Sequence, residues 1–183
     1  MSLENIVSNK KYLFLDRDGV INKRIVGGYI TKWENFEFLP GVIEALIAFS
    51  NHFDRIFIVT NQQGIGKGLM SEADLLAIHK SLKKTIEEKG GRIDGIYHCP
   101  MLKDTDNNCR KPGTKMALWA QADFPEIEFK KSIMVGDTYT DMEFAKNAGM
   151  KAVLLINEFS NEQDKASSHT YINSLSDISN LLK

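Results

Sequence analysis

The sequence predicts an α/β fold with a mainly parallel sheet, because short apolar runs alternate with segments of helical periodicity. No repeat or linker divides the 183 residues, so we expect one domain over residues 1–183, a three-layer Rossmann-like core with helices on both faces of the sheet. The five runs that indicate buried strands are Tyr12–Leu15, Ile56–Thr60, Ile93–His98, Ser132–Val135 and Ala152–Ile156.

Helix signals fill the segments between these strands. An apolar stripe over Val42–Phe49 begins shortly after Pro40, and proline suits a first helical turn. The hydroxyl of Ser71 can cap a helix whose apolar residues recur at three-to-four spacing as far as Ile86. Further helices are expected over Thr114–Asp123, Asp141–Asn147 and Leu175–Leu182.

Composition limits the possible partners. Lys and Arg number 23 and Asp and Glu 24, giving a formal net charge of −1 and a pI near 6.4. This balance offers no general attraction for nucleic acid or an anionic membrane. The longest purely apolar stretch, Ala152–Ile156, is far shorter than the ~20 residues that cross a bilayer. We therefore expect a soluble, cytoplasmic monomer that binds neither nucleic acid nor membrane.

Two motifs whose residues could take part in catalysis or ligand binding follow the first two strands. Asp16 and Asp18 come directly after the first, and two desolvated carboxylates this close need a metal, hydrogen bonds or a shared proton. The alternative is an Asp-rich turn. Thr60 and Asn61 end the second strand, and three nearby glycines let backbone amides approach an oxyanion such as phosphate. The alternative is a flexible glycine-rich loop.

Two further motifs lie later in the chain. Arg110 offers a fork for bidentate phosphate contact and Lys111 a point charge, although a solvated basic pair is the alternative. Asp137 follows the fourth strand and indicates a metal ligand. Asp141 indicates a carboxylate that braces that ligand or a nearby lysine, and a helix cap is the competing interpretation. The 4 histidines are scattered, and His79 is interpreted as an ordinary helix residue.

The chain carries a carboxylate pair, a hydroxyl, a lysine and an aspartate in this order. By this order of motifs the sequence resembles the haloacid dehalogenase (HAD) superfamily of phosphotransferases over nearly its whole length. The matching segments are residues 16–22, 35–42, 60–65, 94–100, 109–112 and 135–137. Within the superfamily, the chain is most similar to the small capless phosphatases of subfamily III, which include heptose-bisphosphate and histidinol phosphatases. The resemblance implies a HAD core with no large cap domain.

The resemblance also implies a Mg²⁺-dependent phosphomonoester hydrolase that forms an aspartyl-phosphate intermediate. Asp16 would be the nucleophile and Asp18 the general acid and base, while Thr60 and Lys111 would stabilise the transferring phosphoryl group. Mg²⁺ would be held by Asp16, the backbone carbonyl of Asp18 and Asp137. The residues expected to bind the substrate, a small phosphorylated sugar, are Asn61, Gln62, Arg110, Gly28, Tyr29 and Thr138.

The expected reaction is removal of the 7-phosphate of D-glycero-D-manno-heptose 1,7-bisphosphate during synthesis of surface-polysaccharide precursors. A histidinol-phosphate phosphatase or a polynucleotide 3′-phosphatase-like enzyme is the alternative on the same scaffold. From a different class, the chain could be a phosphate-binding regulatory domain without catalysis. The intact set of Asp16, Asp18, Lys111 and Asp137 favours an enzyme, because a degenerate binding domain can lose any of them.

The 2 cysteines, Cys99 and Cys109, are too few for a disulfide scaffold and indicate reduced thiols or vestigial metal ligands. Many members of the resembling family hold a structural zinc through C-x-H and C-x-C motifs in this loop. Here the other two ligand positions are Met101 and Asn107, and a thioether and a carboxamide are poor zinc ligands. We therefore predict that no zinc is bound.

Overall fold

The computed structural model describes residues 2–182 and contains a six-stranded, all-parallel sheet with β1 next to its centre. β1 pairs with β2 on one side and with β4 on the other. A crevice is expected at the carboxyl ends of strands where the chain order reverses in this way. The strands, in order across the sheet, are β3 (Gly95–Cys99), β2 (Arg55–Asn61), β1 (Tyr12–Leu15), β4 (Ser132–Gly136), β5 (Lys151–Leu155) and β6 (Thr170–Ile172).

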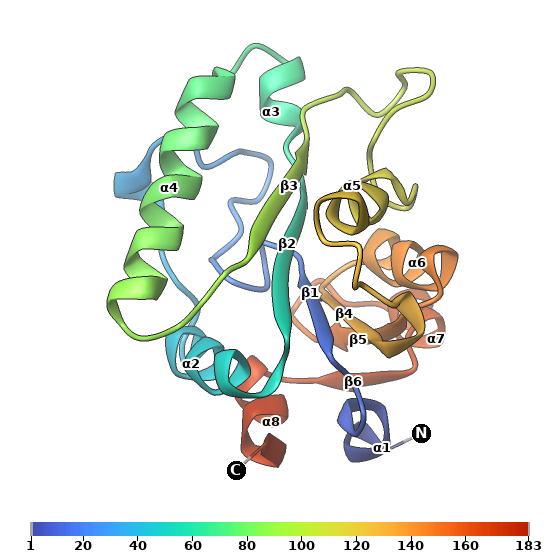
Figure 1. Cartoon of the computed structure of the whole chain (residues 1–183). Helices are drawn as coiled ribbons and strands as arrows, with labels where there is room; N and C mark the ends of the chain where they lie inside the picture. Colours follow the sequence, from blue (N-terminus) through green and yellow to red (C-terminus); the bar gives the residue numbers. More distant parts are fainter. Residues whose placement is uncertain (1, 183) are drawn as a thin grey trace.

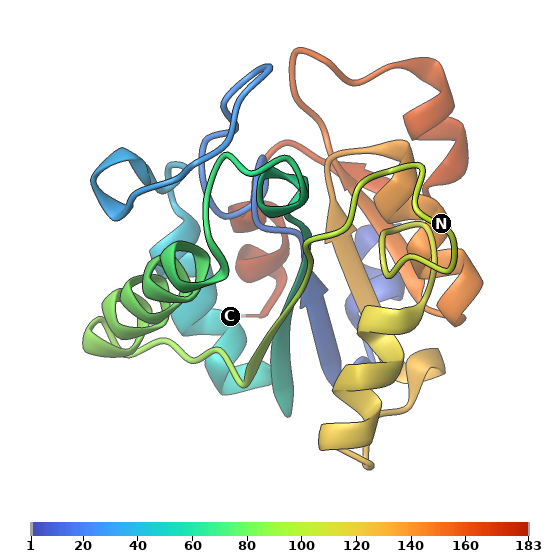
Figure 2. The same cartoon turned by 90° about the horizontal axis from the view of Figure 1, so that it is seen from above.

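Helices cover both faces of the sheet, which confirms the predicted three-layer α/β fold. α2, α4 and α8 lie on one side, and α5 and α6 lie on the other (Figure 1, Figure 2). The α-helices are α1 (Leu3–Val7), α2 (Val42–His52), α3 (Gln63–Gly66), α4 (Glu72–Glu88), α5 (Lys115–Asp123), α6 (Tyr139–Ala148), α7 (Glu162–Ser167) and α8 (Leu175–Ser179). Short 3-10 turns occupy Trp33–Asn35, Phe129–Lys131 and Asn180–Leu182.

Each face of the sheet has its own hydrophobic core. On β1, Leu13 and Leu15 pack into the cluster with α2 and α8, while Tyr12 and Phe14 pack into the cluster with α5 and α6. Successive side chains of a strand point to opposite faces, so a strand buried on both must be apolar throughout. This explains why the strands of the sequence appear as continuous apolar runs.

Side-chain caps define where two of the helices, α4 and α6, begin. Ser71 begins α4 as predicted: its hydroxyl accepts from the backbone N–H of Asp74, and the Asp74 carboxylate accepts from the backbone N–H of Ser71. Thr138 and Asp141 form the same arrangement on α6, which therefore begins earlier than the predicted Asp141. Gly149 ends α6 with φ of 80°, as a left-handed cap residue.

Four short elements, α1, α3, α7 and β6, were not predicted. α3 lies within the glycine-rich segment, and in Figure 1 it stands beyond the end of β2 with the loop that follows β3. Within residues 2–182 no cap domain stands over the sheet, which agrees with the prediction. None of the helices in this described range has the length and apolar character that a membrane span needs.

Candidate active site

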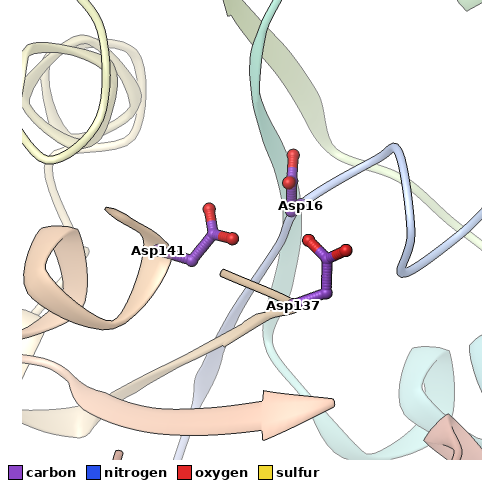
Figure 3. A group of neighbouring side chains, drawn as sticks. All are labelled: Asp16, Asp137 and Asp141. Carbon is purple, nitrogen blue, oxygen red and sulfur yellow. The ribbon is translucent and has the colours of Figure 1, made fainter. Parts of the chain in front are cut away.

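Three carboxylates meet at the carboxyl edge of the sheet. Asp16 follows β1, Asp137 follows β4, and Asp141 lies in the first turn of α6 (Figure 3). All three are buried, and one carboxylate oxygen from each lies within 4.8 Å of the others. Because β1 and β4 are adjacent and parallel, their ends bring together residues that are about 120 positions apart in sequence. We call these residues the acid cluster.

Lys111 supplies the positive charge of the acid cluster. It comes from the loop after β3, is 4% exposed, and its Nζ lies 2.9 Å from Asp16 Oδ1 and 2.5 Å from Asp141 Oδ1. The ammonium also donates to the carbonyl of Val59 at 2.8 Å, near the end of β2. Burial lowers the pKa of Lys111, but Asp141 and Asp16 raise it by more, so the group stays charged.

The three carboxylates of the acid cluster outnumber the two cations that contact them, Lys111 and Arg24, whose Nη2 lies 3.1 Å from Oδ1 of Asp137. Burial raises the pKa of Asp16 to about 6, although Lys111 opposes the shift. Burial, and then the charges of Asp141 and Asp16, raise the pKa of Asp137 to about 8. A divalent cation would remove this penalty, and carboxylate oxygens are the ligands that Mg²⁺ prefers. The donor set therefore fits Mg²⁺.

Asp18 lies beside the acid cluster but faces a different set of partners. Nη2 of Arg17 lies 3.0 Å from Oδ1 and 2.9 Å from Oδ2 of Asp18. The side-chain amides of Asn22 and Gln62 donate to the same carboxylate at 2.9 Å and 2.8 Å. Burial acts to raise the pKa of Asp18, but the Arg17 charge and these hydrogen bonds outweigh it and hold the pKa below its usual value.

Gly19 permits the backbone after Asp18 to lie close to the carboxylate of Asp137. Its φ is 95°, and a Cβ atom at this position would lie 2.2 Å from Oδ2 of Asp137. An alanine here would be both strained and in collision with the acid cluster, so only glycine fits. This close approach explains why a glycine follows the carboxylate pair in the sequence.

A pocket of about 350 Å³ opens onto Asp16, Asp18, Lys111 and Asp141, whereas Asp137 lines a second pocket of about 480 Å³. Of the residues predicted from the sequence, the 350 Å³ pocket is lined by Asp16, Asp18, Thr60, Asn61, Arg110, Lys111, Gly28, Tyr29 and Thr138. Gln62 is buried behind the pocket, where its amide also donates to Thr60 Oγ1. The hydroxyl of Thr138 donates to Asp141 at 2.6 Å, so it serves the helix cap as well as the pocket wall.

Sequence reasoning missed two residues that contact Asp137. Arg24 Nη2 lies 3.1 Å from Oδ1 of Asp137, and the Asn157 amide donates to Oδ2 at 3.1 Å. Both residues come from irregular segments, one after β1 and one after β5, where no periodic pattern marks a position. Arg24 also lines the 350 Å³ pocket. The only signal in the sequence is its place in a segment that follows a strand end.

The prediction of reduced cysteines was wrong. Cys99 at the end of β3 and Cys109, 10 positions later in the sequence, form a disulfide with their Cα atoms 5.4 Å apart. The loop after β3 returns to its starting point before it delivers Lys111, which brings the two thiols together. The number and spacing of the cysteines in the sequence do not reveal that the loop folds back in this way. The absence of zinc at Cys99, Met101, Asn107 and Cys109 stays a prediction.

Comparisons with known proteins agree with this geometry. A family model described as HAD-hydrolase-like matches residues 108–178. The D-glycero-alpha-D-manno-heptose-1,7-bisphosphate 7-phosphatase of Mycobacterium tuberculosis (strain CDC 1551 / Oshkosh) is 43% identical over 140 residues, covering 76% of this chain and 74% of the relative. The chain belongs to the family of HAD-like heptose-bisphosphate phosphatases. Membership confirms the predicted superfamily and makes the protein a phosphatase.

Other relatives differ in the sugar anomer that their names give. A D-glycero-alpha-D-manno-heptose-1,7-bisphosphate 7-phosphatase of Campylobacter jejuni is 40% identical and covers 84% of this chain and 87% of its own. The D-glycero-beta-D-manno-heptose-1,7-bisphosphate 7-phosphatase of Photorhabdus laumondii is 34% identical and covers 93% of this chain and 94% of its own. The crystal structure of D,D-heptose 1,7-bisphosphate phosphatase from B. bronchiseptica, complexed with magnesium and phosphate, has a TM-score of 0.83 at 26% identity, covering 94% and 97%.

Proposed function

We propose that this protein removes the 7-phosphate of D-glycero-D-manno-heptose 1,7-bisphosphate in a Mg²⁺-dependent reaction, as a step toward surface-polysaccharide precursors. The observation that carries the proposal is the acid cluster with Lys111 in contact with two of its members, Asp16 and Asp141, set in a chain 43% identical to a heptose-bisphosphate phosphatase. A non-catalytic phosphate-binding domain would not need both the acid cluster and Asp18.

In the first half of the reaction Asp16 attacks phosphorus. Its Oδ1 is held by the backbone N–H of Arg17 and by Lys111, so Oδ2, which takes part in neither contact, is the proposed nucleophile. A bond forms between Oδ2 and phosphorus while the bond from phosphorus to the sugar oxygen breaks. For this step Asp18 must first be protonated, which its contacts with Arg17, Asn22 and Gln62 oppose. It then gives that proton to the sugar oxygen, and the product is an aspartyl-phosphate with a free sugar hydroxyl.

In the second half water attacks the aspartyl-phosphate. Asp18, now ionised, takes a proton from the water while the water oxygen bonds to phosphorus. The bond between phosphorus and Oδ2 of Asp16 breaks, and inorganic phosphate is released. The polar contacts from Arg17, Asn22 and Gln62 favour the ionised carboxylate that this step requires. Thr60 and Lys111 neutralise charge on the phosphoryl oxygens in both halves.

Asp16, Asp137 and the backbone carbonyl of Asp18 are the proposed Mg²⁺ ligands. When bound, the ion supplies positive charge beside the phosphoryl oxygens. Asp141 is proposed to hold Lys111 in place, since its carboxylate contacts the lysine at 2.5 Å and also caps α6. Removing Asp141 should therefore disturb the position of the lysine more than the binding of substrate.

Arg110 is proposed to bind the second, non-reacting phosphate of the bisphosphate, with Asn61, Gly28, Tyr29 and Thr138 as further substrate-binding positions. Gln62 was expected to bind substrate too, but it is buried behind the pocket and is proposed to act through its contacts with Asp18 and Thr60. Its guanidinium lines the pocket next to Lys111, and Arg24 and Lys67 line the same pocket. Lys67 Nζ lies 5.4 Å from the centre of the Tyr29 ring. A pocket with this many cations suits a substrate with two phosphate groups.

The test measures kcat/KM for both heptose 1,7-bisphosphate anomers, histidinol phosphate and a 3′-phosphorylated oligonucleotide, with and without Mg²⁺. The proposal is supported if kcat/KM for one heptose anomer exceeds that for histidinol phosphate and for the oligonucleotide by at least about tenfold, which is ~1.4 kcal/mol of differential transition-state binding. A smaller preference, or a higher value for another substrate, rejects the heptose assignment. Asp16→Asn should abolish turnover, and activity retained in that variant rejects the covalent mechanism.

A monomeric state and a cytoplasmic location remain part of this proposal. The Cys99–Cys109 disulfide argues against the cytoplasmic location, because cytosolic thiols are usually kept reduced. Metal analysis of the purified protein tests the predicted absence of zinc.

A further inference from the structure

Arg17 is a buried guanidinium in contact with the carboxylate that transfers protons. It lies between Asp16 and Asp18 in sequence and is only 1% exposed. Its Nη2 donates to both oxygens of Asp18, as described above. An arginine side chain has many rotatable bonds, so this contact is well defined only if something else fixes the guanidinium.

His79 on α4 fixes the other end of the guanidinium. Nη1 of Arg17 lies 3.2 Å from Nε2 of His79, and the imidazole is 5% exposed. Arginine has only donors, so Nε2 must accept, and the ring must be neutral with its proton on Nδ1. The surroundings agree with this tautomer, because burial and then the charge of Arg17 lower the pKa of His79 to about 3.

The position of His79 on its helix shows that packing alone does not require it. The other buried residues of α4 are aliphatic and recur at three-to-four spacing: Leu75, Ile78, Leu82 and Ile86. An aliphatic residue at 79 would continue this stripe without the desolvation penalty of an imidazole. It would also leave Nη1 of the buried Arg17 without this acceptor. The imidazole at this position is therefore explained by its hydrogen bond to the guanidinium of Arg17 and not by packing in the core.

We propose that Arg17 and His79 are positioning residues for Asp18: the fixed imidazole holds the guanidinium, and the guanidinium holds the carboxylate at the angle needed for proton transfer. The inference rests on the role of Asp18 in the proposed function. Small displacements of a group that transfers protons reduce catalysis strongly, so the effect should appear in a reaction step rather than in substrate binding.

The test compares leaving groups in His79→Leu, His79→Gln and the wild type. The kcat/KM value reports the steps up to formation of the aspartyl-phosphate, where Asp18 gives its proton to the leaving oxygen. Glycerol 2-phosphate has an alkoxide leaving group that needs this proton, whereas p-nitrophenyl phosphate releases a stable phenolate that does not. Both substrates contain one phosphate, so the comparison does not depend on recognition of heptose.

We expect His79→Leu to lower kcat/KM about tenfold or more for glycerol 2-phosphate, and less than about threefold for p-nitrophenyl phosphate. In His79→Gln the side-chain carbonyl can accept from Arg17, and both values should return to within about threefold of the wild type. Equal losses for the two substrates, no loss for either, or no rescue by glutamine would each overturn the proposal.

Leu82→Ala is the matched control, because it removes a buried side chain from the same helix one turn later and has no polar contact with the site. It should change both substrates alike. If circular dichroism shows that His79→Leu does not fold, Arg17→Lys replaces it. A lysine keeps the charge but has a single nitrogen that cannot span His79 and Asp18, so the same selective loss is expected. Failure of the heptose assignment, seen in the substrate panel, would leave this comparison unaffected.

Discussion

Replacing Lys111 by methionine tests the electrostatics of the acid cluster directly. The variant keeps the length of the buried stem but removes the ammonium that contacts Asp16 at 2.9 Å and Asp141 at 2.5 Å. The lysine side chain is 1% exposed and the Asp141 side chain 0%, so water cannot take the place of the lost charge.

The magnitude follows from burial. Removing one partner of a buried ion pair leaves an uncompensated charge and lowers the free energy of unfolding by about 3–5 kcal/mol. The pKa of Asp16 is already raised to about 6, and loss of Lys111 raises it further. An acid with a raised folded pKa destabilises the fold above that pKa, and the penalty falls as the pH drops through it. The loss should therefore be large at pH 8 and smaller at pH 5.

The assay is urea-induced unfolding at pH 8 and pH 5 in the presence of a chelator. Lys80→Met is the control, because Lys80 is exposed on α4 and its replacement should change stability by no more than about 0.5 kcal/mol. A loss below ~1 kcal/mol for Lys111→Met at pH 8, or the same loss at both pH values, would refute the reasoning. Addition of Mg²⁺ should recover part of the loss, since the cation replaces the missing positive charge.

Two other predictions concern stability. The pKa of His79, near 3 in the folded protein, means that the unfolded chain takes up the proton first as the pH falls below 6.5, so wild-type stability should fall by ~2 kcal/mol more than that of His79→Gln between pH 7 and pH 5. A difference between the two proteins that does not change with pH would contradict this. Replacing both Cys99 and Cys109 by serine should lower stability by about 3 kcal/mol in the chain-entropy model. A melting temperature that stays within ~2 °C of the oxidised protein would count against it.

Regular elements were predictable where burial alone decides them. β1 has the predicted bounds, because four apolar residues buried on both faces can form little else. α4 begins after Ser71, since its cap is a local interaction encoded within four residues. β6 escaped prediction because it has three residues, and Tyr171 at its centre is exposed. A strand of this kind is defined by pairing with β5, which lies far from it in sequence.

The functional residues likewise divide into those that the sequence could predict and those that it could not. Acids at strand ends could be found, because the carboxyl edge of a parallel sheet is a consequence of the fold. The partners of Asp18 could not all be found, since the contact from His79 through Arg17 joins residues 62 positions apart. The disulfide was missed for a similar reason, because the path of the loop after β3 depends on its tertiary contacts. A histidine in an apolar helix stripe was the one available signal, and the sequence offered no reason to connect it with Arg17.

The strand order has a consequence for synthesis of the protein. β1 receives its second neighbour only when β4 is complete, and Asp141 follows five residues after Gly136. A nascent chain that has emerged as far as β3 therefore contains Asp16 and Asp18 but not Lys111, Asp137 or Asp141. Pairing of strands so distant along the chain is slow, and chaperones would meet an exposed, apolar β1 edge during that interval. Phosphatase activity should consequently arise only after the chain as far as Asp141 has left the ribosome.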